Sequence, residues 1–204
     1  MKEVVLAPGL WNPGAAMAFL AARLAASGFK PHVFAYRGRS PFEGNVASFA
    51  NFLRERFDGH PMHVVGHSLG GVLVFETLTR HPEIPVGSVV LLGAPVRGCL
   101  TGRRFGDARL GRWMMGACRE LWVERKAAWQ RSEPLGVIAG TIPLGLGRAL
   151  GQLPGPSDGV VCVEETTIEG MSARALMPQG HSMLILSGRV ATAVAHFLES
   201  GRFE

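Results

Sequence analysis

Cysteine is scarce in this sequence. The 204 residues include three cysteines, Cys99, Cys118 and Cys162, an odd number at wide spacing. That number and that spacing fit neither a disulfide framework nor a zinc site. We interpret the three side chains as small apolar residues, and we expect no metal to be bound by them.

Long apolar runs are missing as well. No segment reaches the ~18 uncharged apolar residues that span a bilayer. The start of the chain carries Lys2 and Glu3, and it lacks the basic, apolar and small-residue order of a signal peptide. Internal repeats and low-complexity linkers are also absent. We therefore expect a cytoplasmic protein, and a length of 204 residues suits one domain over residues 1–204.

Acidic residues are outnumbered, and the imbalance is local. The chain has a formal net charge of +5, yet residues 97–131 alone hold eight Arg and one Lys against three acidic residues. We favour a solvated helical face for this stretch. Attraction of an anionic ligand, or peripheral contact with an anionic lipid surface, is the alternative. No nucleic acid is expected as a partner, because the stretch is short, lacks a recognised motif and has apolar positions that indicate packing.

Short apolar runs and amphipathic stretches alternate along the chain. Several runs are continuously apolar, which is typical of strands buried on both faces of a parallel sheet. The alternation predicts an α/β fold with a mostly parallel sheet and helices on both faces. The expected strands are 2–7, 31–36, 61–66, 87–93, 135–139 and 174–177, and the expected helices are 13–27, 45–57, 69–80 and 190–199.

The strongest chemical signal is Gly66-His67-Ser68-Leu69-Gly70-Gly71, between an expected strand and an expected helix. In G-x-S-x-G the central residue sits on a sharp strand-to-helix turn, and the glycines let neighbouring backbone approach closely. The turn presents the serine hydroxyl above the sheet edge, beside the start of a helix. Ser68 is therefore the candidate nucleophile. The alternative is a glycine-rich turn that contains a serine without a catalytic role.

A serine hydroxyl needs a base to accept its proton, and the base needs an acid to orient it. His181 is the candidate base, because it lies in a loop after the last expected strand; an exposed loop histidine is the alternative. Asp158 is the candidate acid, since it falls between Ser68 and His181 in a loop after strand 135–139; a structural Asx-turn is its alternative. The competing acids are Asp107, Glu164 and Glu165, and the histidines set aside are His32, His60, His63, His67, His81 and His196.

Two backbone N–H groups are needed to stabilise the oxyanion that forms on the attacked carbonyl. One should come from the residue after the nucleophile, Leu69. The other should come from the loop after the first strand, Ala7-Pro8-Gly9-Leu10-Trp11, where Leu10 is the candidate donor.

The basic stretch is also aromatic. We call residues 96–131 the cap segment; it contains Trp113, Trp122 and Trp129. Apolar residues at near-helical spacing predict an amphipathic helix in it. The helix could cover Ser68 as a lid with its apolar face toward an acyl chain, or it could be an ordinary covering helix. The apolar positions are Leu110, Met114, Ala117, Leu121 and Ala128.

Four motifs together resemble the small bacterial lipase- and esterase-like α/β hydrolases. Residues 66–71 resemble their nucleophile elbow, and residues 92–98 are similar to the turn that follows it. Asp158-Gly159-Val160-Val161 resembles their acid loop, and Gly180-His181-Ser182-Met183-Leu184 resembles their base loop. One departure is Pro8-Gly9, where the family usually has His-Gly.

The resemblance implies an α/β-hydrolase fold, a triad of Ser68, Asp158 and His181, and hydrolysis of a small-molecule acyl ester without cofactor or metal. Two other classes of function stay open. An acyltransferase or thioesterase would use the same triad with a different acyl acceptor or donor. A non-catalytic binding protein could keep the scaffold without turnover.

Overall fold

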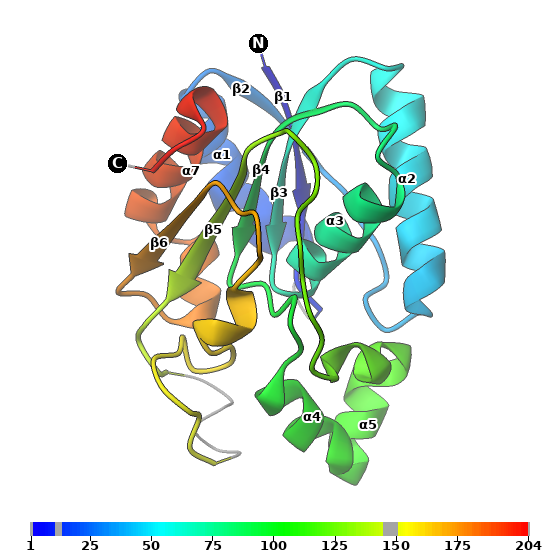
Figure 1. Cartoon of the computed structure of the whole chain (residues 1–204), viewed down its shortest axis with the longest axis vertical. Helices are drawn as coiled ribbons and strands as arrows, with labels where there is room; N and C mark the ends of the chain where they lie inside the picture. Colours follow the sequence, from blue (N-terminus) through cyan, green and yellow to red (C-terminus); the bar gives the residue numbers. More distant parts are fainter. Residues whose placement is uncertain (1, 11–13, 145–150, 204) are drawn as a thin grey trace.

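The computed structural model describes residues 2–10, 14–144 and 151–203 (Figure 1). Its centre is a six-stranded sheet with the order β2-β1-β3-β4-β5-β6, in which every neighbouring pair is parallel. The carboxyl ends of all six strands therefore meet at one edge of the sheet. The strands are β1 (Lys2–Ala7), β2 (Phe29–Val33), β3 (Met62–His67), β4 (Val86–Leu92), β5 (Leu135–Gly140) and β6 (Ala173–Met177).

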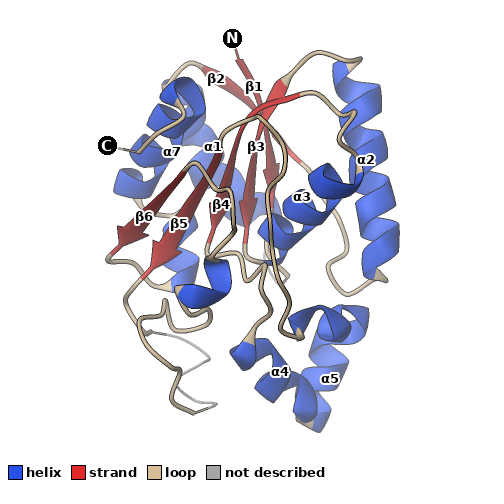
Figure 2. Cartoon of the chain, in the orientation of Figure 1, coloured by secondary structure: helices blue, strands red, loops and turns tan. Residues whose placement is uncertain are grey.

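Helices cover both faces of the sheet (Figure 2). One face carries α2 (Phe42–Phe57) and α3 (Leu69–Arg80), and the other carries α1 (Ala18–Ala26) and α7 (Gly188–Ser200). The side chains of β1 alternate between two apolar clusters: Val5 packs with α2 and α3, whereas Val4 packs with α1 and α7. The continuous apolar runs in the sequence arise because both faces are buried, and the predicted α/β class is confirmed.

Several element boundaries differ from expectation. The expected helix 13–27 is divided into the 3₁₀ helix η1 (Gly14–Met17) and α1 (Ala18–Ala26), and its first residue lies outside the described residues. Helix α7 is longer at both ends than the expected 190–199. Strand β2 begins at Phe29 and ends at Val33, earlier than the expected 31–36. Among the described residues it is an edge strand whose one neighbour is β1, and so it tolerates Pro31, which has no N–H to donate. Helix α2 begins at Phe42 rather than at Asn45. Helix α3 covers the predicted residues 69–80.

The cap segment does not form the single amphipathic helix that its apolar spacing predicts. It forms three short pieces: α4 (Leu100–Asp107), α5 (Arg109–Met115) and the 3₁₀ helix η2 (Gly116–Trp122). Extended backbone at Ala108 ends α4, and Gly116 with φ of +60° ends α5. The apolar repeat from Leu110 to Ala128 is therefore interrupted twice, at Gly116 and at the extended backbone of Val123 that follows η2.

The three tryptophans of the cap segment have different environments. Trp122 and Trp129 are buried, and Trp129 packs against Phe75 of α3 in the main core. Trp113 on α5 is 67% exposed. The three cysteines are buried and free. None of the helices in the described part of the chain is long and apolar enough to cross a membrane.

Candidate active site

Ser68 lies at the turn between β3 and α3, with φ of +54° and ψ of −123°. A non-glycine residue rarely adopts positive φ, so the turn is strained and is held by its surroundings. The flanking glycines allow it: a Cβ on Gly66 would lie 2.5 Å from Cα of Gly71, and one on Gly70 would lie 2.2 Å from the carbonyl oxygen of Ala7. The motif thus has the close backbone approach that its glycines predict.

His181 contacts Ser68 from the segment that follows β6, at the carboxyl edge of the sheet. It begins the 3₁₀ helix η4 (His181–Ile185), which follows β6. Its Nε2 lies 2.9 Å from Oγ of Ser68, and its Nδ1 lies 2.7 Å from Oδ2 of Asp158. A carboxylate only accepts hydrogen bonds, so Nδ1–H donates to Asp158 and Nε2 is left to accept the serine proton.

Asp158 is 1% exposed and is fixed by its own loop. Its Oδ1 accepts from the N–H groups of Val160 and Val161 at 2.9 and 2.7 Å, which is a turn of the Asx type. The same carboxylate uses Oδ2 for His181. The structural and the catalytic interpretations of Asp158 are therefore compatible, because each uses a different oxygen.

The competing acids have other partners. Glu164 pairs with Arg97. Glu165 accepts hydrogen bonds from the N–H of Leu100 at 2.6 Å and of Cys162 at 2.8 Å, and burial raises the pKa of its carboxyl. These two bonds tie the start of α4 to the acid loop. Asp107 is the last residue of α4 and is exposed.

The two expected oxyanion donors flank the nucleophile. Leu69 is the first residue of α3, where an N–H has no partner within the helix. Leu10 borders the same cavity as Ser68, in the loop after β1. The N–H of Ser68 itself is occupied by the carbonyl of Leu92 at 2.9 Å. The place of the two donors fits an oxyanion hole, which remains a prediction.

The loop after β1 lacks the family's His-Gly but is held in another way. The hydroxyl of Tyr36 donates to the carbonyl oxygen of Pro8 at 2.8 Å. Burial raises the pKa of Tyr36, so the phenol keeps the proton that it donates. Gly9 packs tightly against the elbow, since a Cβ on it would lie 3.2 Å from Cβ of Ser68.

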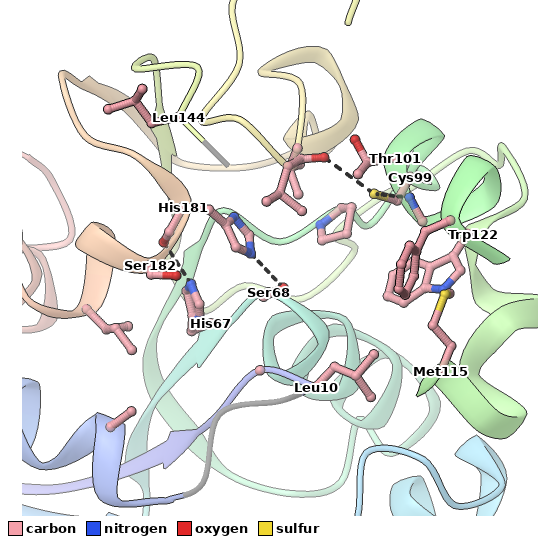
Figure 3. A pocket seen from close by; sticks show the side chains of 18 of the residues that line it. Leu10, His67, Ser68, Cys99, Thr101, Met115, Trp122, Leu144, His181 and Ser182 are labelled. Carbon is pink, nitrogen blue, oxygen red and sulfur yellow. Dashed lines mark hydrogen bonds between the residues drawn. The ribbon is translucent and has the colours of Figure 1, made fainter. Parts of the chain in front are cut away.

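A cavity of about 560 Å³ opens above Ser68. In Figure 3, Ser68 lies between His181 on one side and Trp122 and Met115 on the other. The motifs did not predict Met115 and Trp122 as walls of the cavity, because both come from the cap segment, where helical spacing was the signal in the sequence. The apolar walls include Leu10, Phe105, Met115, Trp122, Leu144, Val160, Val161, Ile185 and Leu186.

The sequence model of the alpha/beta hydrolase family matches residues 4–195. The chain belongs to this family. A search of curated proteins gives no match. The family membership agrees with the parallel sheet, the strained turn at Ser68 and the position of the cavity at the carboxyl edge of the sheet.

Solved structures show the same fold. A lipase from Bacillus licheniformis in its propeptide form superposes with a TM-score of 0.78 at 16% identity, covering 95% of this chain and 50% of the lipase chain. This chain therefore spans about half the length of that form. A thioesterase from Streptomyces coelicolor gives 0.64 at 16% identity, covering 98% and 90% of the two chains. A pyrethroid hydrolase from Sphingobium faniae gives 0.64 at 16%, covering 98% of each chain.

Proposed function

We propose that this protein is a serine hydrolase that cleaves carboxylic esters through an acyl-enzyme. One observation carries the proposal: Ser68 Oγ, His181 and Asp158 form a continuous hydrogen-bonded chain beneath an apolar cavity. Both links, of 2.9 and 2.7 Å, are within hydrogen-bonding reach, and the first is short enough for His181 to take the proton of Ser68. All three side chains occupy the carboxyl edge of the sheet, where the family places its chemistry.

Acylation follows from this geometry. His181 Nε2 takes the proton of Ser68 as Oγ bonds to the ester carbonyl carbon, and the carbonyl oxygen becomes an oxyanion facing the N–H groups of Leu69 and Leu10. The buried carboxylate of Asp158 stabilises the imidazolium. The C–O bond to the alcohol then breaks, and His181 donates its proton to the departing alkoxide oxygen.

Deacylation repeats the cycle with water. His181 takes a proton from a water molecule as its oxygen bonds to the acyl carbon. The bond from that carbon to Ser68 Oγ breaks, and His181 returns the proton to Oγ. The products are the free acid, the alcohol and the starting enzyme. This cycle requires no metal and no cofactor.

The volume and the apolar lining of the cavity indicate the size and the chemical class of the substrate. Its volume of about 560 Å³ falls in the range of roughly 300–1,000 Å³ that is typical of small-molecule sites. We propose that the cap segment acts as a lid and holds the acyl chain against Phe105, Met115 and Trp122. A short to medium acyl chain suits this space. An acyl-thioester would meet the same triad, so thioesterase or acyltransferase activity is the second candidate.

Hydrolysis of p-nitrophenyl esters from acetate to palmitate tests the proposal. The wild type should show turnover with a maximum at short or medium chain length, and Ser68→Ala should show none. Ser27→Ala is the matched control, because it removes an exposed hydroxyl that bonds only locally to Arg23. Full activity in Ser68→Ala would contradict the proposal. Acyl-thioesters and added alcohols in the same assay distinguish thioesterase and transferase activity from esterase activity.

A further inference from the structure

His67 is the neighbour of the nucleophile, and the sequence alone gives it no role. It is the last residue of β3 and is 4% exposed. Its ring lies beside that of His181, with centroids 4.9 Å apart and an angle of 42° between the planes. Its Nε2 lies 3.1 Å from the backbone carbonyl oxygen of His181, across 114 positions of the chain (Figure 3).

The protonation state of His67 follows from these contacts. A carbonyl oxygen only accepts, so Nε2 carries the proton and donates it. Burial first, and the neighbouring His181 second, lower the pKa of His67 to about 3, which leaves the ring neutral at physiological pH. Nδ1 then has a free lone pair, and within the described residues it has no hydrogen-bond partner.

The main chain of His181 is held by two hydrogen bonds, one of them from His67. The N–H of His181 donates to the carbonyl of Asp158 at 2.9 Å, and its carbonyl accepts from His67. Its side chain is held by the carboxylate of Asp158. With both peptide groups tied, the distance from Nε2 of His181 to Oγ of Ser68 depends on His67 as well as on Asp158.

We propose that His67 is a positioning residue, whose Nε2–H holds the backbone of the base at the distance that proton transfer from Ser68 requires. This inference rests on the proposed function. The neutral state suits the role, because a cationic ring beside His181 would oppose the imidazolium that forms during acylation.

Two substitutions test the role. Gln places an amide N–H near the position of Nε2, whereas Leu removes the donor. Because a displacement of about 1 Å costs on the order of 10²-fold in rate, His67→Leu should lower kcat by about that factor with little change in KM. His67→Gln should stay within about tenfold of wild type. Thermal unfolding confirms that both variants are folded.

The rate at which a fluorophosphonate labels Ser68 gives a second readout that needs no substrate, and it should follow the same order of variants. Equal kcat in His67→Leu and wild type, or equal losses in the Leu and Gln variants, would overturn the role. Either result would leave the proposed function intact, since that depends on Ser68→Ala.

A second, independent feature is the exposed side of α5. Leu110 and Trp113 are 64% and 67% exposed, and they lie three positions apart, on one side of the helix. Arg109 and Arg112 beside them are also exposed. We call these four residues the tip. The guanidinium of Arg39 lies 5.0 Å from the Trp113 ring and donates to its backbone oxygen at 2.6 Å, which holds α5 in place.

The composition of the tip matches an anionic bilayer surface. Tryptophan and leucine partition into the boundary between headgroups and acyl chains, and arginines are attracted to anionic headgroups. The tip lies at the same end of the molecule as the carboxyl edge of the sheet (Figure 1). We infer that the tip docks on anionic phospholipid bilayers and brings the cavity end of the protein to that surface.

Sedimentation with vesicles tests the docking. The protein should bind vesicles of phosphatidylcholine and phosphatidylglycerol, and it should not bind vesicles of phosphatidylcholine alone. Each arginine near such a surface contributes a factor of about five in partitioning. Arg109→Gln with Arg112→Gln should therefore weaken binding about 25-fold.

Matched controls distinguish the contribution of the tip to vesicle binding from the effects of net charge and of exposed apolar side chains elsewhere. Arg189→Gln with Arg202→Gln removes the same charge from exposed positions on and after α7. Leu176→Ser removes an exposed leucine from β6, whereas Leu110→Ser removes one from the tip. Only the tip variants should weaken binding. Absent binding by the wild type, or equal losses in the controls, would overturn the inference.

Discussion

Replacing Gly70 by alanine tests the contact between the nucleophile elbow and the loop after β1. The added Cβ would lie 2.2 Å from the carbonyl oxygen of Ala7 and 2.4 Å from that of Pro8. Carbon and oxygen atoms do not approach closer than about 3 Å, so the start of α3 and the end of β1 must separate by about 1 Å. Those two segments carry the proposed oxyanion donors, Leu69 and Leu10.

The expected result is a loss of activity with a moderate loss of stability. Misplacing one donor costs about 10²–10³ in rate, so kcat/KM for a p-nitrophenyl ester should fall by that factor. Overpacking costs about 1–3 kcal/mol, which for a chain of this length lowers Tm by roughly 2–4 °C per kcal/mol. The protein should remain folded at 25 °C, and kinetics with thermal unfolding measure both effects.

Gly44→Ala is the matched control for this substitution. Gly44 is exposed in the first turn of α2, and a Cβ on it would meet no atom of the described part of the chain within 4 Å. Alanine is favoured over glycine in a helix by about 1 kcal/mol, so Tm should rise slightly and kcat/KM should not change. If Gly70→Ala kept kcat/KM and Tm at wild-type values, the proposed coupling between the elbow and the loop would be refuted.

Three further perturbations address the acid, the buried histidine and the cap segment. Asp158→Asn should lower kcat about 10⁴-fold, because the amide favours the wrong tautomer of His181, whereas Glu164→Gln should leave kcat unchanged; steady-state kinetics decide. Because the pKa of His67 is lowered from 6.5 to about 3 in the fold, unfolding takes up a proton below pH 6.5 and stability falls as pH decreases from 6.5 toward 3. Urea unfolding at several pH values measures this effect. Below pH 6.5 the free energy of unfolding should fall less steeply with decreasing pH in His67→Gln than in the wild type, and an equally steep fall would contradict the assignment. Deleting residues 106–127 should raise activity on soluble short esters and lower it on long ones, while equal losses on both would indicate a structural role for the segment.

The elbow could be predicted from the sequence because its geometry is local. Gly66, Gly70 and Gly71 allow one strained turn, and α3 begins and ends where the pattern predicts. The order of Ser68, Asp158 and His181 along the chain was enough to identify candidates that the fold then brings within hydrogen-bonding distance. Parallel strands place such loops at one edge.

The cap segment could not be predicted in the same way. Its apolar spacing is helical, but the backbone leaves the helical conformation at Ala108 and at Gly116. Glycine commonly ends a helix, whereas alanine is a strong helix former, so the break at Ala108 has no signal in the sequence. The environment of Trp113 depends on those breaks. The hydrogen bond between His67 and the carbonyl of His181 could not be predicted from the sequence either, because it joins residues 114 positions apart through a backbone atom.

Mass spectrometry of the quenched reaction tests the central claim most directly. The protein is mixed with excess p-nitrophenyl butyrate, stopped with acid within the first turnover and digested. We predict one added butyryl group on the peptide that contains Ser68, and none in Ser68→Ala. Release of p-nitrophenol by the wild type with no acyl group on Ser68, or with the group on another residue, would contradict the acyl-enzyme account.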